Sequence, residues 1–186
     1  MEHKLNTSEN CSASVARGAT HGESISAQGR FEIVCHGADG VEKWRDHIKN
    51  LVTTVGKNDI LDKYLLGSVY TATFRMGLKG AGTAAAGDTQ ASHAGWLEVG
   101  LANAPTYTGN RKDVTMGAAS SGTSASPTQV FAITSSGTVA GCFTNNGGSA
   151  TKDNTTGILF SAGDFSGGSK SVTNGDTLSV SYSLSV

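Results

Sequence analysis

The sequence of 186 residues carries a formal net charge of −1 at pH 7, which gives no electrostatic basis for binding nucleic acid or an anionic membrane surface. No apolar run approaches the roughly 20 residues that cross a bilayer, and the first ten residues lack the apolar segment of a secretory signal. Only 37% of the residues are hydrophobic and 6% aromatic, while 25 are glycine. We therefore expect a thin core, which β proteins often supplement by oligomerisation.

Charged residues are concentrated in the first half of the chain. Of the 29 charged residues (14 Lys and Arg plus 15 Asp and Glu), only eight lie in 101–186. This split predicts three segments: a flexible N-terminal arm over 1–28, a β-hairpin with a short helix over 29–67, and a β-domain rich in Gly, Ser and Thr over 68–186. The arm is polar and has too little apolar surface to fold alone.

Residues 30–48 have the pattern of a β-hairpin. Residues 30–36 form the first predicted strand, and the Gly-Ala-Asp-Gly sequence at 37–40 has the chemistry of a tight turn. The return strand is predicted over 41–48, with Trp44 and Ile48 pointing inward.

A short helix is predicted after the hairpin, over 53–66, and Gly67 follows where a C-terminal cap glycine belongs. Its apolar residues recur with helical spacing and are expected to face the core, while its charged residues face water. The expected core stripe is Val55, Ile60, Leu61, Tyr64 and Leu65, and the expected solvent face is Lys57, Asp59, Asp62 and Lys63.

The rest of the chain has the pattern of short strands separated by turns. From Leu178 to Val186, apolar residues alternate with serine, which is typical of a half-buried strand. Regular strands of this kind predict a mainly β fold, an antiparallel β-sandwich or barrel. Residues 81–92 fit either a short helix or a long loop. The predicted strands are 69–78, 114–119, 128–133, 138–144, 157–163, 170–173 and 177–186, and the turns are 135–137, 145–148, 166–168 and 174–175.

The three cysteines provide no metal site. Cys11, Cys35 and Cys142 form no CxxC pair and lack metal-ligand spacing. Free thiols are the simplest interpretation, although the odd count and the polar surroundings of Cys11 leave an intermolecular disulfide open in an oxidising setting. The sequence predicts no metal and no cofactor.

One group of residues resembles a catalytic set. Asp88, Ser92 and His93 match a hydrolase triad by residue type, but a triad must converge in space. Adjacent Ser92 and His93 point apart on most backbones, and no GxSxG motif frames the serine. A local turn bonded by Asp88 and Ser92 and anchored by Trp96 explains them better. We therefore expect no catalytic residue and no enzymatic activity.

Three longer segments are similar to a family of small structural proteins of tailed bacteriophages, generally encoded among the head genes. They are NLVTTVGKNDILDKY at 50–64, with Trp44 ahead of it, AGDTQASHAGW at 86–96 and VTNGDTLSVSY at 172–182. The resemblance covers about 29–186 and implies a virion component, in particular a capsid decoration (cement) protein. It supplies no catalytic residues and no role for Cys11.

The resemblance and the composition together predict a non-enzymatic virion protein, synthesised in the host cytoplasm and located on the capsid surface. Its expected partner is the major capsid protein, and it is expected to bind as a homo-oligomer, with a trimer favoured. The arm (1–28) and the hairpin–helix segment (29–67) are expected to face the capsid, with Trp44 as the contact anchor. The alternative is a tail, fibre or host-receptor-binding module that uses the turns at 145–148 and 166–168.

Overall fold

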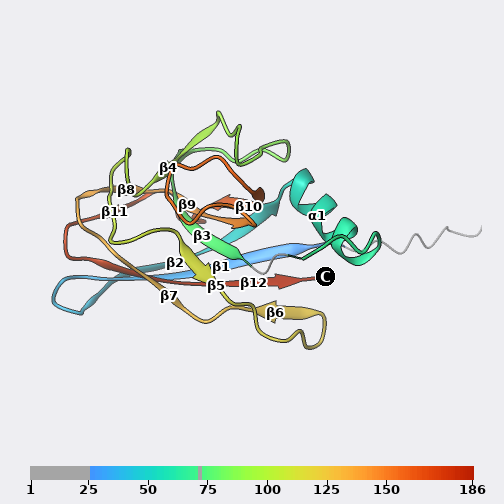
Figure 1. The fold of residues 1–186 in the computed structure, drawn as a ribbon. Coiled ribbons are helices and arrows are strands. Elements are labelled where there is room, and N and C mark those ends of the chain that lie inside the picture. The colour runs from blue at the N-terminus through green and yellow to red at the C-terminus, as the bar shows by residue number, and fades with distance from the viewer. Residues whose placement is uncertain (1–25, 71–72) are drawn as a thin grey trace, which may run out of the picture.

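The computed structural model describes residues 26–70 and 73–186, so most of the predicted arm lies outside the described residues. Strands dominate the described part, with one helix at the edge of the domain (Figure 1). In chain order the elements are β1 (Gln28–His36), β2 (Glu42–Val52), α1 (Thr54–Tyr64), β3 (Phe74–Gly82), β4 (Trp96–Val99), β5 (Lys112–Val114), β6 (Thr123–Ala125), β7 (Gln129–Ala132), β8 (Gly137–Val139), β9 (Gly141–Asn146), β10 (Ile158–Asp164), β11 (Lys170–Val172) and β12 (Thr177–Ser185).

The main sheet is antiparallel, with strand order β4-β3-β9-β10-β2-β1-β12-β6; β5 also pairs with β3, and β7 with β12. Its two halves are joined at β2 and β10 by only two residue pairs, Val52 with Ser161 and Leu51 with Ala162. Side chains from both halves meet in one hydrophobic core. The predicted mainly β fold is confirmed, and of the two predicted architectures the sheet has the open, sandwich-like one.

The strand β1 lies between β2 and β12 and pairs with both along nearly its whole length. Phe31 and Ile33 on β1 are buried, as are Val180 and Tyr182 on β12, so the predicted alternation is confirmed from Leu178 to Tyr182, whereas Val186 is exposed. The hairpin strand β1 pairs directly with β12. The main sheet therefore contains strands from both the predicted hairpin–helix segment (29–67) and the predicted β-domain (68–186).

Several strand boundaries differ from the prediction. β3 begins at Phe74, well after residue 69, and the strand predicted over 138–144 is divided at Ala140 into β8 and β9. Asn145 and Asn146, predicted to lie in a turn, are buried at the end of β9. Beyond Gly82 the ambiguous stretch is a loop, and the sequence pattern missed β4 and β6, which are three or four residues long.

Helix α1 forms where the sequence predicts it. The Thr53 side chain caps the helix by accepting a hydrogen bond from the Gly56 N–H, and its hydroxyl donates to the Leu159 carbonyl on β10. After the helix, Gly67 adopts the left-handed φ of +70° that favours glycine. Both caps therefore follow from side-chain chemistry that is readable in the sequence.

The orientation of α1 differs from the prediction, although Ile60 of the predicted stripe does pack against the core. The helix turns Gly56 and Asp59 toward the sheet, whereas Leu61, Tyr64 and Leu65 are exposed. A Cβ atom at Gly56 would overlap the Phe160 carbonyl oxygen of β10, so only glycine permits this approach. Asp59 then accepts a hydrogen bond from the Asn146 amide at 2.7 Å. Small and polar groups together with Ile60 thus hold the helix on the sheet, and Leu61, Tyr64 and Leu65 point away.

Asp46 on β2 holds the turn between β10 and β11. Its carboxylate accepts hydrogen bonds from the Ser166 hydroxyl at 2.6 Å and the Gly167 N–H at 3.0 Å, and it pairs with Lys170 at 3.1 Å. Burial opposes ionisation of the carboxyl group, but bonds from Ser166, the His47 N–H, Lys170 and Gly167 outweigh it and lower the pKa of Asp46 to about 2.

The contact at Gly56 leads to a stability prediction. Gly56→Ala should lower the free energy of unfolding by about 1–3 kcal/mol, because the added methyl group displaces α1 from β10. Urea unfolding checks this, with Gly87→Ala as the control, since a Cβ atom at Gly87 meets nothing within 4 Å. A stabilised Gly56→Ala protein, as helix propensity alone requires, would contradict the close contact.

The network around Asp46 predicts acid sensitivity. Because the pKa of Asp46 is lower in the folded state than its unfolded value of about 4, its contribution to stability is complete above that pH and is lost as the pH falls toward 2. Urea midpoints of the wild type and Asp46→Asn should therefore differ most above pH 4 (about the unfolded pKa) and converge as the pH falls. A difference that is independent of pH would show that the carboxylate charge is not involved.

Candidate functional site

The residues that resemble a hydrolase triad serve a local turn. Asp88 accepts hydrogen bonds from the Ala85 N–H at 2.8 Å and the Trp96 indole N–H at 2.9 Å. The ring of His93 stacks on Trp96, with centroids 4.0 Å apart, and its Nδ1 lies 3.1 Å from the Trp96 carbonyl oxygen. Within the described part of the chain no hydrogen bond joins Asp88, Ser92 and His93 to one another. The predicted turn anchored by Trp96 is confirmed.

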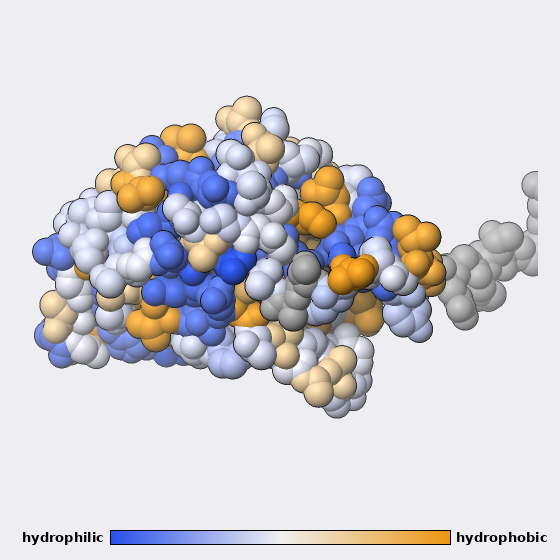
Figure 2. All heavy atoms as spheres, in the orientation of Figure 1, coloured by the Kyte–Doolittle hydropathy of each residue, from blue (hydrophilic) through white to orange (hydrophobic). Residues whose placement is uncertain are grey.

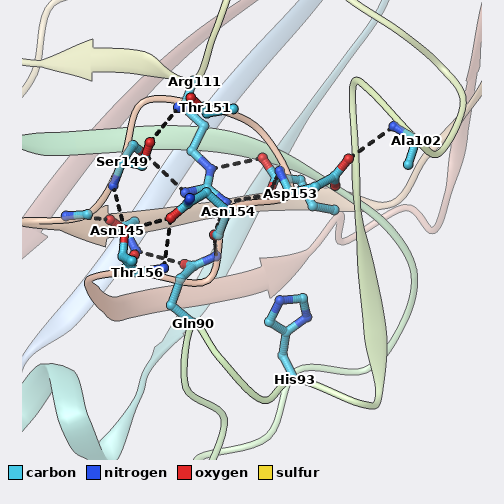
Figure 3. Close-up of polar contacts among 12 residues, drawn as sticks. Gln90, His93, Ala102, Arg111, Asn145, Ser149, Thr151, Asp153, Asn154 and Thr156 are labelled. Carbon is cyan, nitrogen blue, oxygen red and sulfur yellow. Dashed lines mark hydrogen bonds and ion pairs between the residues drawn. The ribbon is translucent and has the colours of Figure 1, made fainter.

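A buried ion pair organises the neighbouring loops (Figure 3). The two carboxylate oxygens of Glu98 accept hydrogen bonds from Arg111 at 2.9 and 2.6 Å, and the two side chains are 2% and 0% exposed. Arg111 also donates to the carbonyl oxygens of Ser149 at 3.1 Å and Asn154 at 2.8 Å. The Asp153 N–H completes the network by donating to Glu98 at 2.9 Å. Sequence reasoning missed this pair, because 13 residues and an irregular loop separate its members.

A hollow of about 400 Å³ adjoins this network and is lined by residues that include Gln90, His93 and Asn154. Figure 3 shows His93 apart from the hydrogen-bonded network. No group of three His, Cys, Asp or Glu side chains that could hold a metal ion occurs within 26–70 and 73–186. The polar groups beside the hollow are therefore explained by the fold itself.

The cysteines of the described residues, Cys35 and Cys142, are buried and free. Burial, reinforced by the charge of Asp176, raises the pKa of Cys35 to about 11, and burial raises the pKa of Cys142 well above its ordinary value. Both thiols are protonated at neutral pH, and a protonated thiol is a poor nucleophile. Cys11, the candidate for an intermolecular disulfide, lies outside the described residues.

Trp44, the predicted contact anchor, is half-buried at the edge of the core. Its ring packs edge-on against Phe165, with centroids 5.6 Å apart, and its indole N–H donates to the Ser171 carbonyl at 3.4 Å. The indole thus fastens β2 to Phe165 and to β11. A contact between Trp44 and a partner stays a prediction.

The most extensive exposed apolar area lies on α1 and the residues around it. Side chains there are widely exposed, for example Tyr64 at 86% and Leu65 at 72%. Figure 2 shows hydrophobic side chains gathered at this end of the molecule. We call this area the α1 surface; seven of the twelve exposed large hydrophobic side chains of the described residues belong to it, namely Leu61, Tyr64, Leu65, Leu66, Val69, Tyr70 and Val186.

The α1 surface is shaped as well as apolar. A groove of about 630 Å³ runs along it, lined by residues that include Ile60, Leu61 and Val186. The chain after the helix folds back on α1, because Lys63 donates a hydrogen bond to the Val69 carbonyl. Contiguous exposed apolar areas of this kind mark interaction sites on soluble domains. The helix itself is too short and too polar to cross a membrane.

Comparisons with protein-family models, with curated proteins and with solved structures found no match to this chain. The function is therefore argued from the surface of the molecule.

The buried ion pair gives a further stability prediction. Glu98→Ala leaves the Arg111 charge buried without its partner, which should lower the free energy of unfolding by about 3–5 kcal/mol. Urea unfolding measures this, with Glu42→Ala as the control, because Glu42 pairs with Arg45 on the exposed face of β2 and exposed pairs contribute little. Equal midpoints for the two variants would show that the Glu98–Arg111 pair does not hold the loops.

Proposed function

We propose that this chain is a non-enzymatic structural protein of a tailed-bacteriophage virion, a decoration protein that binds the outer capsid surface through the α1 surface. The observation that carries the proposal is the gathering of large exposed apolar side chains on and around α1. Burying apolar area contributes roughly 25 cal/mol per Å², so covering this surface is a strong driving force for docking. The resemblance of residues 50–64, 86–96 and 172–182 to phage head proteins supports the virion as the setting.

The remaining chemistry of the domain supports binding over catalysis. His93 stacks on Trp96 and is not hydrogen-bonded to Ser92, and both described thiols are buried. The Arg111 side chain donates its hydrogen bonds to groups within the protein itself. The domain has the character of a rigid scaffold that presents one surface.

The N-terminal segment supports the same docking face. Ser26 and Ala27, where the described chain begins, line the apolar groove. A segment that is covalently attached at this point and also contacts the partner would strengthen binding through its high effective concentration. We propose the major capsid protein as this partner, with the decoration protein bound as a homo-oligomer, a trimer being favoured.

The turns that would serve a receptor-binding module are instead used by the fold. Asn145 donates from its amide to Gln90 at 2.8 Å and is fully buried, and Ser166 and Gly167 are bonded to Asp46. These contacts favour docking through α1 over recognition through the turns at 145–148 and 166–168.

Co-sedimentation with undecorated heads and, separately, with isolated tails tests the proposal. The wild type should bind heads saturably, and Leu65→Asp should bind more than tenfold more weakly, since burying one leucine contributes about 1.5–3 kcal/mol. Val41→Asp is the matched control, because Val41 is 62% exposed at the hairpin turn, away from α1. Deleting residues 1–25 should also weaken binding.

Binding to tails alone, or head binding that Leu65→Asp leaves unchanged, would contradict the proposal. The first result would favour a tail or receptor-binding role, and the second would place the docking face elsewhere on the domain.

A further inference from the structure

We infer that the segment seated on the α1 surface carries carboxylate side chains next to apolar ones, so that the site recognises an acidic–apolar protein segment. The inference rests on the proposed function only in taking the capsid as the source of that segment. Its basis is a second hollow, directly beside the apolar groove, in which the charged lining groups of the described residues are all cationic.

The second hollow, here the basic hollow, has a volume of about 470 Å³. Arg30, Lys49 and Lys57 line it together with polar groups such as Asn50 and Ser183, and among residues 26–70 and 73–186 no Asp or Glu lines it. It shares Ser26, Ala27 and Lys57 with the apolar groove. Lys57 lines both the basic hollow and the apolar groove. A partner carboxylate that binds Lys57 must therefore lie close to the partner's apolar side chains in the groove.

Two of the cations face one another in the isolated domain. Arg30 on β1 lies directly opposite Lys49 on β2, on the exposed side of the strand pair, since their neighbours Phe31 and Ile48 are buried. Like charges directly opposite each other on adjacent strands are unfavourable. Glu32 pairs with Arg30 at 2.5 Å and compensates one of them.

The two cations that Glu32 does not compensate, Lys49 and Lys57, are left for a partner. Within 26–70 and 73–186, neither Lys49 nor Lys57 forms an ion pair. A carboxylate bound in the basic hollow would neutralise them and relieve the repulsion between Arg30 and Lys49.

The charge pattern selects among the possible occupants. A second copy bound by two-fold symmetry would bring Lys49 and Lys57 of both copies toward each other, which like-charge repulsion opposes. A nucleic acid would engage the cations but leave Leu61 and Leu65 without apolar partners, and the net charge of −1 gives the chain no overall attraction to a nucleic acid or to an anionic membrane surface. A protein segment with adjacent acidic and apolar side chains fits both hollows at once.

The first arm of the test reverses charges in the basic hollow and measures binding to heads. The double variant Lys49→Glu with Lys57→Glu should bind heads on the order of tenfold more weakly than the wild type, and added salt should weaken the wild type more than the variant. Arg45→Glu is the control with the same change of sign, because Arg45 lies on β2 outside both hollows. Lys49→Glu alone should not lower the unfolding midpoint, because it removes the repulsion with Arg30 and so separates lost binding from lost folding.

Synthetic probes make the second arm independent of heads. Fluorescence anisotropy would compare a labelled peptide in which two glutamates precede alternating leucines and serines, the same peptide with lysines in place of the glutamates, and an oligothymidylate. The acidic peptide should bind most tightly and lose binding to the double variant.

The two arms separate the inference from the proposed function. Selective binding of the acidic peptide without binding to heads would overturn the capsid as partner and leave the acidic–apolar site standing. Head binding that the double charge reversal leaves unchanged, together with peptide binding that does not respond to it, would overturn the inference alone. Tightest binding of the oligothymidylate would overturn it in favour of a phosphate ligand.

Discussion

The approach of α1 to β10 at Gly56 is the contact on which the functional surface depends. The helix backbone lies so close to the Phe160 carbonyl that no side chain fits between them. Once that face is fixed on the sheet, helical geometry directs Leu61, Tyr64 and Leu65 outward. Thr53 and Asp59 reinforce the contact through hydrogen bonds to Leu159 and Asn146. The exposed apolar surface is thus a consequence of how the helix is held.

The rest of the molecule supplies a support for this surface. The strand β1 lies between β2 and β12, and these three strands carry much of the core. Of the large side chains of α1 only Ile60 packs against that core, so Leu61, Tyr64 and Leu65 remain for a partner. The cations of the basic hollow come from β1, β2 and α1, so the same elements that support the apolar groove also place charge beside it.

The sequence predicted the features that are set by local chemistry. The turn after His36, the glycine that ends the helix at Gly67 and the alternation through Tyr182 all depend on neighbouring residues, and each is present. The orientation of α1 could not be predicted, because the spacing of Leu61 and Leu65 is the same whether the stripe faces a core or a partner. The burial of Asn145 depends on Gln90, 55 residues away, and composition carries no signal for such a distant partner.

Hydrogen exchange of the free and the head-bound protein tests the central claim most directly, namely that α1 is the covered face. Binding should slow amide exchange in α1 and in the first residues of β1, while strand β4 around Leu97 and the hairpin turn at Val41 exchange as in the free protein. Slowed exchange around Leu97 or Val41, with α1 unchanged, would contradict this claim and would assign the docking face to the opposite part of the domain.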